Sequence, residues 1–453
     1  MYPALLIFGL VLSAAVIFVQ IKRAGVAAVA YYPITIFALY FAIIHFLTPL
    51  VKYFSGWFRY QSEYNNTTLV YSVVLSIVFL LFASALNEVF SRKTTQLIKL
   101  YRGTSSSVSD KNAKNTFWVG LAIALMGAFF AWSDLSTITS ASGSFENFLL
   151  DRHLHSQARS STRIFSNFLI PGSAAILAAA LLSKKRMSKI LLFGTLAAFT
   201  VYYANAISSR NTILVFALIN LSVYFFFSSQ RKTSMPRLNI KGLMLTLTSV
   251  AAIAGAAYYV TLQRYSISDS AYLAERREAI IFFTLDGAFG NDEARPWMID
   301  NGHELYWGAT YLAAVTNLIP RSIWPDKPLG AGPRLINMVR PGSFIIGQEG
   351  NNSLTTGLVV EARMNFGVPG VFLAIFLLAY FSNRMTRSAI RSQSILSKVT
   401  LIIAAVSINS MLLYSEFLGF FFRFLMLTTP LLIATYMQRI SFRSTLHMQR
   451  GAN

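Results

Sequence analysis

The chain has 453 residues, of which 55% are hydrophobic and only 13% charged, and its mean hydropathy is +0.52. These values exclude a soluble globular protein of this length. The formal net charge of +21 does not indicate nucleic-acid binding, because the surplus of Lys and Arg falls in alternate short loops between apolar segments. The absence of cysteine excludes disulfides and thiolate metal sites.

Eleven apolar segments are long enough to cross a hydrocarbon core as helices, centred near residues 11, 41, 78, 125, 174, 197, 219, 253, 369, 406 and 427. The first has no basic residue ahead of it and is followed by Lys22 and Arg23, so we expect a permanent span and not a cleaved signal peptide. The alternating basic loops predict a periplasmic N-terminus and a cytoplasmic C-terminus in a bacterial inner membrane.

These segments predict an all-α polytopic integral membrane protein with four regions. They are transmembrane helices 1 to 8 in residues 1–262, with a smaller periplasmic loop at 134–165; a large periplasmic loop at 263–354; helices 9 to 11 at 355–437; and a basic cytoplasmic tail at 438–453. The large loop contains two apolar stretches too short to span, 279–290 and 306–319. They predict interfacial or re-entrant helices; the alternative is a small independent periplasmic domain.

Arginines outside the cytoplasmic loops are the first candidates for binding a ligand. Arginine grips phosphate oxygens at two points, whereas lysine offers one point charge. Arg210, Arg363 and Arg423 fall in the outer half of predicted spans, where a charge is costly unless it faces a polar cavity. With Arg264 of the large loop they are candidates for binding a diphosphate. The alternatives are contact with lipid head groups, or an ion pair of Arg423 with Glu416 on one helix face.

The segment 319–328 combines three prolines with Arg321, Trp324 and Asp326. Proline fixes the backbone, tryptophan stacks on the apolar face of a sugar ring, and charged groups bond its hydroxyls, so these three residues are candidates for glycan binding. Equally, Trp307 and Trp324 could be anchors at the membrane surface.

Polar and charged residues are dense where the ninth span begins. Glu361 and Glu349 are the best-placed carboxylates to act as a base on a sugar hydroxyl, and Asn352 is a further candidate for glycan binding. The chain has no Walker, dinucleotide-binding or zinc motif, so we expect no metal and no cofactor. His153 and His155 are read as exposed loop residues, because no carboxylate cluster accompanies them.

At these residues the sequence resembles the Wzy-type oligosaccharide repeat-unit polymerases, the O-antigen polymerase family, which are related to the O-antigen ligases. The likeness rests on the many-span layout with one dominant late outer loop, on Ser209-Arg210-Asn211, on the segment 319–328, and on Asn352-Ser353 followed by Glu361 and Asn365-Phe366-Gly367-x-x-Gly370. One departure is Asn351, because the resemblance to ligases and some polymerases would place a histidine at this position. A histidine base is therefore not carried over to this chain.

The resemblance implies a GT-C-like membrane glycosyltransferase that is metal-independent and inverting. Its substrates would be undecaprenyl-diphosphate-linked oligosaccharides, joined on the periplasmic face into O-antigen or a related polysaccharide. Membrane lipids and a chain-length-regulating co-polymerase are the implied partners.

Two other functions remain open. An O-antigen ligase would use the same donor chemistry and differ only in its acceptor. A lipid-linked oligosaccharide flippase or transporter would usually show repeated halves and short loops on both sides, which this chain lacks.

Overall fold

The computed structural model describes residues 1–56, 58–101, 110–144, 147, 161–183, 186–207, 209–230, 255, 285–287, 289–348 and 353–450. Every regular element in these ranges is a helix. The elements before the large loop are α1 (Tyr2–Ala24), η1 (Gly25–Ala27), α2 (Ala28–Tyr31), α3 (Pro33–Ala42), the π-helical turn η2 (Ile43–Leu47), α4 (Thr48–Ser55), α5 (Asn66–Tyr101), α6 (Asp110–Ser142), η3 (Ser161–Phe168), α9 (Leu169–Leu182), α10 (Met187–Ala206) and α11 (Arg210–Gln230). The later ones are η5 (Gly290–Glu293), α15 (Ala294–Asn301), α16 (Ala309–Thr316), α17 (Ala331–Val339), α18 (Gly357–Arg391), α19 (Ile395–Tyr414) and α20 (Phe417–Arg450).

The protein is a multi-pass membrane protein. In the described part of the chain, ten helical segments are long and apolar enough to cross a membrane, and they match ten of the eleven predicted spans. The remaining one, centred near residue 253, lies outside the described residues except for Gly255. Large apolar side chains such as Phe129, Trp132 and Leu191 are 67%, 65% and 74% exposed on the outer faces of their helices. Lipid would cover these faces, as expected for spans at the edge of a bundle.

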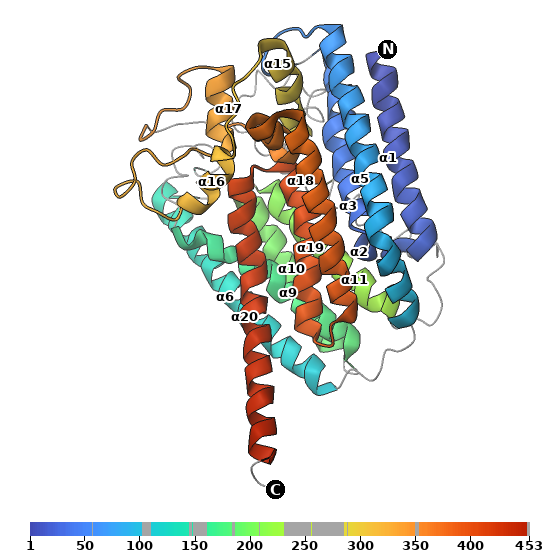
Figure 1. The fold of residues 1–453 in the computed structure, drawn as a ribbon. Helices are drawn as coiled ribbons and strands as arrows, with labels where there is room; N and C mark the ends of the chain where they lie inside the picture. The colour runs from blue at the N-terminus through green and yellow to red at the C-terminus, as the bar shows by residue number, and fades with distance from the viewer. Residues whose placement is uncertain are drawn as a thin grey trace.

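The two ends of the helix bundle are formed by different elements, and the chain termini lie at opposite ends (Figure 1). The last turn of α11 lies at the lower end, where the Tyr31 hydroxyl is 2.8 Å from Ser229 Oγ. By contrast, η5 lies at the upper end, where Lys52 of α4 donates to Glu293. The described chain therefore stops at the lower end, after α11, and resumes at the upper end, before η5. An odd number of spans, eleven in the prediction, requires this arrangement.

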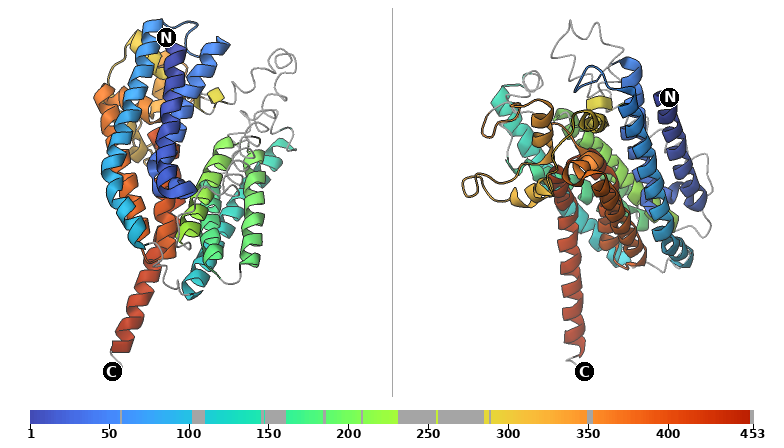
Figure 2. Two further views of the ribbon diagram at one scale, coloured as in Figure 1. Left: turned by 90° about the vertical axis from the view of Figure 1, so that its right-hand side faces the viewer. Right: turned by 45° about the horizontal axis from the view of Figure 1, so that its top comes forward.

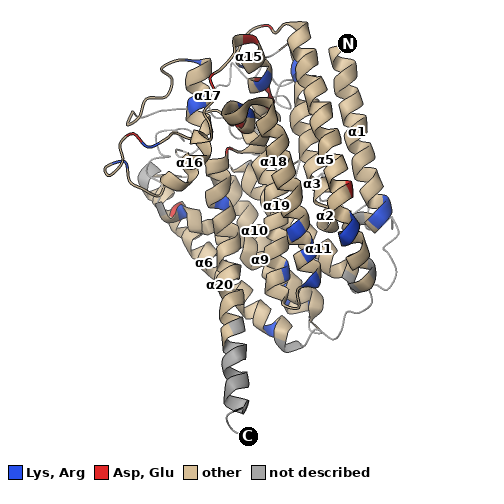
Figure 3. Ribbon diagram, viewed as in Figure 1, with Lys and Arg blue, Asp and Glu red and all other residues tan. Residues whose placement is uncertain are grey.

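Charge is distributed unevenly between these ends (Figure 3). Lys and Arg recur at the lower end, as in Arg23 at the end of α1 and Arg384, Arg387 and Arg391 at the end of α18. Among the described acids of the large loop, Asp292 and Glu293 lie at the upper end. This is the asymmetry on which the predicted orientation depends.

The helices form two adjoining groups (Figure 2). The main core is built by α1, α3, α5, α11, α18 and α19, and a second apolar cluster joins α6, α9 and α10. α6 and α9 approach closely, because a Cβ at Gly172 would lie 2.5 Å from the Ala124 nitrogen and one at Gly127 would collide with Leu169. Small residues at such crossings are typical of helix packing in membranes.

The upper end is built by the short helices α15, α16 and α17 together with the first turns of α18 (Figures 1 and 2). α18 leaves the helical conformation at Gly367, where φ is 67° and ψ is −158°. A Cβ at Gly370 would lie 2.7 Å from the Ala362 carbonyl oxygen, so the bend requires glycine there too. The Asn365-Phe366-Gly367-x-x-Gly370 pattern therefore encodes a kink that separates the turns carrying Glu361 and Arg363 from the rest of α18.

Several predicted boundaries differ from the structure. The apolar stretch 306–319 forms a single short helix, α16, while 279–290 lies largely outside the described residues. Residues 134–142 were predicted as part of a loop but continue α6, and 438–450 of the predicted tail continue α20. The described part of the large loop is attached to the spans by its own short helices.

The cysteine-free chain allows the orientation to be tested directly. Ser343 and Gln393 are exposed, Ser343 after α17 at the upper end and Gln393 in the lower turn between α18 and α19. We expect a membrane-impermeant maleimide to label Ser343→Cys in spheroplasts, and Gln393→Cys only after the inner membrane is opened. Labelling in the reverse order would show that the upper end faces the cytoplasm.

Candidate functional site

Buried charged groups gather at the upper end, and the first set fixes η5 to α4. Lys52 Nζ lies 2.6 Å from Asp286 Oδ1 and 2.5 Å from Glu293 Oε2. Arg59 also pairs with Asp286, and Glu293 Oε1 accepts the backbone N–H groups of Arg59 and Tyr60 at 2.7 and 2.8 Å. Breaking a buried pair leaves an uncompensated charge, so this network holds the loop rigidly against the second span.

Asp292 extends this set toward α15. Its Oδ1 is 2.6 Å from His45 Nδ1 and 2.8 Å from Arg295 Nη2. Burial by itself raises the pKa of Asp292, but the neighbouring charges of Arg295 and His45 outweigh it and lower that pKa. Asp292 is therefore held as a carboxylate, shared between an imidazole and a guanidinium.

Arg295 is the largest fully buried side chain among the described residues. Although it lies close to Asp292, none of its guanidinium nitrogens makes an aligned hydrogen bond within the described part of the chain. The Nε of Arg363 is likewise buried without a partner there. The two guanidinium groups are close enough to repel each other. Arg295 has only Asp292 nearby, which His45 shares, and the Arg363 Nε has no partner, so the two guanidinium groups leave a surplus of positive charge with free donors. This is what an anion site requires.

Packing between α15 and α18 brings these arginines together. Ala294 and Met298 of α15 share an apolar cluster with Val360 and Met364 of α18. Arg295 and Arg363 each stand one position from a member of that cluster, so the same contact positions both. His303, beyond α15, also reaches α18, with its Nε2 3.3 Å from the Arg363 carbonyl oxygen.

Glu361 is 1% exposed, and both of its oxygens are occupied. Oε1 accepts the Thr310 hydroxyl at 2.7 Å, and Oε2 accepts the Phe417 N–H at 2.6 Å. Asn365 continues the network: its Nδ2 donates to Thr310 Oγ1 at 2.7 Å, and its Oδ1 accepts the Gly308 N–H at 2.9 Å. Glu361 and Asn365 thus tie α16 and the start of α20 to α18.

Glu416 plays a similar part for α17. Its Oε2 accepts the Gly332 N–H at 2.7 Å, in the first turn of α17. Burial raises the pKa of Glu416, and the backbone donors of Gly332 and Ala331 partly oppose this.

The prediction that Glu416 and Arg423 share one helix face is wrong, because α20 begins at Phe417 and Glu416 stands in the turn before it. Arg423 instead lies beside the Tyr414 hydroxyl, without an aligned hydrogen bond.

The other predicted site residues do not all meet at this place. Arg264, Glu349 and Asn352 lie outside the described residues, and Arg210 opens α11 as predicted but its side chain is not described. Arg321 is used within its own turn, donating to the Pro325 and Lys327 carbonyl oxygens at 2.7 and 3.4 Å. Trp324 and Asp326 are exposed on that same turn.

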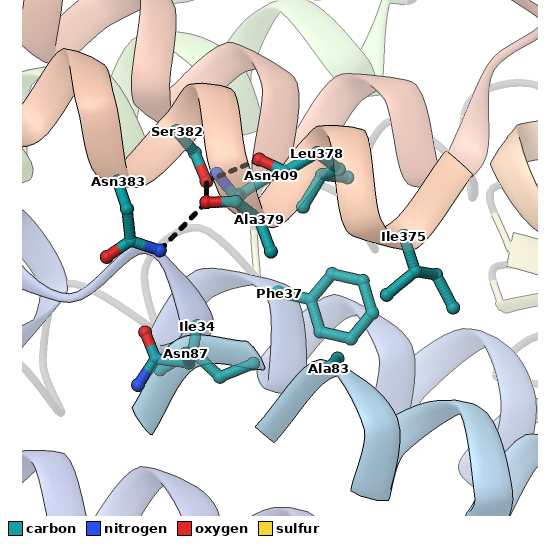
Figure 4. A pocket seen from close by; sticks show the side chains of 10 residues that line it. All are labelled: Ile34, Phe37, Ala83, Asn87, Ile375, Leu378, Ala379, Ser382, Asn383 and Asn409. Carbon is teal, nitrogen blue, oxygen red and sulfur yellow. Dashed lines mark hydrogen bonds between the residues drawn. The ribbon is translucent and has the colours of Figure 1, made fainter. Parts of the chain in front are cut away.

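A small pocket lies deeper in the bundle, between α3, α5, α18 and α19 (Figure 4). Asn87, Asn383 and Asn409 line it, together with Ser382 and apolar side chains. The Asn383 amide donates to the Ala379 carbonyl oxygen at 2.9 Å, whereas the Asn87 amide has no partner within the described residues. No charged side chain lines this pocket, so it does not suit a diphosphate.

Glu361 provides a test of the upper network. Glu361→Leu would leave the buried Thr310 hydroxyl and Phe417 N–H without an acceptor, at a cost of about 1–3 kcal/mol for each group. We expect a clear fall in the unfolding temperature of the purified protein in detergent. Glu361→Gln keeps one acceptor and a polar group, so its loss should be much smaller. Asp326→Asn, at an exposed position, serves as the control, and a Leu variant as stable as the wild type would contradict the network.

Comparison with protein-family models, with curated proteins and with solved structures finds no match to this chain.

Proposed function

We propose that this protein is a membrane glycosyltransferase that polymerises undecaprenyl-diphosphate-linked oligosaccharide repeat units on the periplasmic face of a bacterial inner membrane. The product would be O-antigen or a related surface polysaccharide. The upper end of the bundle would be periplasmic, because the lower end carries the basic turns.

The observation that carries the proposal is the pair formed by Arg295 of α15, which is fully buried, and Arg363 of α18, which is partly buried. The three guanidinium nitrogens of Arg295 and the Nε of Arg363 are buried without an aligned hydrogen bond to any described group. A departing diphosphate develops negative charge, and fixed cations in a water-excluded site stabilise it far better than solvent does. Arginine suits this task because its planar fork bonds two phosphate oxygens at once.

The proposed reaction is a displacement at the sugar carbon linked to the diphosphate. A hydroxyl of the acceptor repeat unit attacks this carbon, the bond to the diphosphate oxygen breaks, and configuration inverts. Arg295 and Arg363 hold the leaving diphosphate, with Arg210, Arg264 and Arg423 as further candidates. The charge that a divalent metal would otherwise supply then comes from arginine.

The proton of the attacking hydroxyl needs an acceptor. Glu361 is less suited than expected, because both oxygens accept internal donors and the side chain is buried. We therefore assign Glu361 to positioning and propose Glu349, in the segment before α18, as the base. Asn352, Trp324, Asp326 and Arg321 remain proposals for glycan contacts.

Arginine variants test the diphosphate site in a reconstituted assay with lipid-linked repeat units. Arg363→Ala and Arg295→Gln should each slow chain growth by about 100-fold or more, the usual cost of removing one donor to a developing anion. Arg210→Ala should also abolish growth. Arg384→Ala, exposed at the lower end, is the matched control. If both upper variants fold and polymerise at the wild-type rate, the site is refuted.

The same assay separates polymerase from ligase through its products. A ladder of lengths on the carrier lipid is expected for a polymerase. Transfer of a finished glycan to another lipid in one step would identify a ligase instead, with the arginine roles unchanged.

A further inference from the structure

An apolar patch lies on the side of the upper end, formed by α16 and the turn that follows it. Its members are large side chains with high exposure: Trp307 (75%), Leu312 (50%), Val315 (56%), Leu318 (67%), Ile323 (74%) and Trp324 (38%). The opposite face of α16, with Thr310, Ala313 and Ala314, is buried. An exposed apolar surface of this size marks an interaction site, here called the α16 patch.

The backbone is built to display this patch. Trp307 has a φ of 47°, which is uncommon for a residue other than glycine. Its N–H donates to the Asn365 carbonyl oxygen at 3.0 Å, and the neighbouring N–H groups of Tyr306 and Gly308 also donate to α18, to Met364 O and Asn365 Oδ1. Strained backbone persists only where the surroundings hold it, and here the held conformation leaves the indole exposed.

The turn after α16 directs its two cations, Lys327 and Arg321, toward its own main chain, whereas Asp326 is exposed. Lys327 is buried, and its Nζ donates to the Ile319 and Asn317 carbonyl oxygens at 2.7 and 3.3 Å. Arg321 donates to two more carbonyl oxygens of the same turn. Ile323 and Leu318 meanwhile point outward, the reverse of a loop made for water. Main-chain groups satisfied from within are what a segment needs to enter a low-dielectric medium.

The position of the α16 patch relative to the ends of the spans indicates that lipid covers it. Tyr311 of α16 packs against Phe417, the first residue of the last span, with ring centroids 5.2 Å apart. The ring of Phe366, just before the kink of α18, also lies beside Tyr311. α16 therefore sits where the spans leave the membrane, beside the upper part of α20 and below α15 and α17 (Figure 1). The patch continues the lipid-facing surface of the helices.

We propose that the α16 patch inserts into the adjacent leaflet of the bilayer, with Leu318 and Ile323 among the acyl chains and Trp307 and Trp324 at the headgroup level. This interaction is separate from the proposed sugar transfer, and for Trp324 it favours the membrane-anchor alternative over the glycan contact. It anchors α16, and through Thr310 and Asn365 it braces the first turns of α18 against the membrane surface.

The absence of cysteine makes the test direct. Ile323→Cys and Leu318→Cys are labelled with a nitrobenzoxadiazole dye, and the protein is reconstituted into vesicles of phosphatidylethanolamine and phosphatidylglycerol that contain doxyl-labelled lipid. Phe129→Cys on the lipid face of α6 is the positive control, and Ser343→Cys in the exposed loop after α17 is the negative control.

Insertion predicts that both patch positions lose fluorescence to doxyl lipid as strongly as Phe129→Cys, with a blue-shifted emission. Quenching of the positive control verifies that the protein is folded and embedded. If the patch positions behave like Ser343→Cys, the patch faces water or another protein, and the proposal is overturned.

Discussion

The cost of burying charge organises the upper end of this protein. Five carboxylates there are largely removed from water, and each is stable only because donors on another element surround it: those of Asp286, Asp292, Glu293, Glu361 and Glu416. Glu293 and Asp286 join the large loop to Lys52, Glu416 caps α17, and Glu361 joins α16 to the start of α20. The short helices η5, α16 and α17 are thus each attached to a span or to the turn between two spans through one of these carboxylates.

The same constraint distinguishes the candidate site from its surroundings. Where each buried carboxylate has enough internal donors, the groups have a structural role and no donor or acceptor remains free to bind a ligand. Between α15 and α18 they do not balance, since Arg295 and Arg363 are neighbours, Arg295 has only Asp292 beside it, and Asp292 is also shared with His45. An anionic ligand would complete this arrangement, which is the physical basis for placing a diphosphate there.

Local features of the sequence predicted the spans well, because hydropathy and loop charge are properties of short segments. The position of Arg363 in the outer half of a span could be predicted from the same local features. Arg295 was not, because its burial depends on α15 packing against residues some sixty positions later, a contact that no local pattern reports. Lys52 did leave a signal: it is one of two lysines outside the basic loops, and it proved to be a buried partner of two acids.

The misassigned residues show a second limit. Glu361 was chosen for its position at the start of a span, but its role depends on Thr310 and Phe417, which come from distant segments. The seven-residue step from Glu416 to Arg423 assumed a helix that begins one residue later. Arg321 looked available for a glycan, yet the prolines around it create free carbonyl groups that it satisfies.

Direct binding of undecaprenyl diphosphate to the purified protein tests the central claim without requiring the correct acceptor sugar. Isothermal titration should show saturable binding that inorganic pyrophosphate weakens by competition. Binding should be lost in the Arg295→Gln and Arg363→Gln double variant while its unfolding temperature stays near that of the wild type. Unchanged binding by a folded double variant would contradict the account, because Arg295 and Arg363 would then have no part in holding the diphosphate.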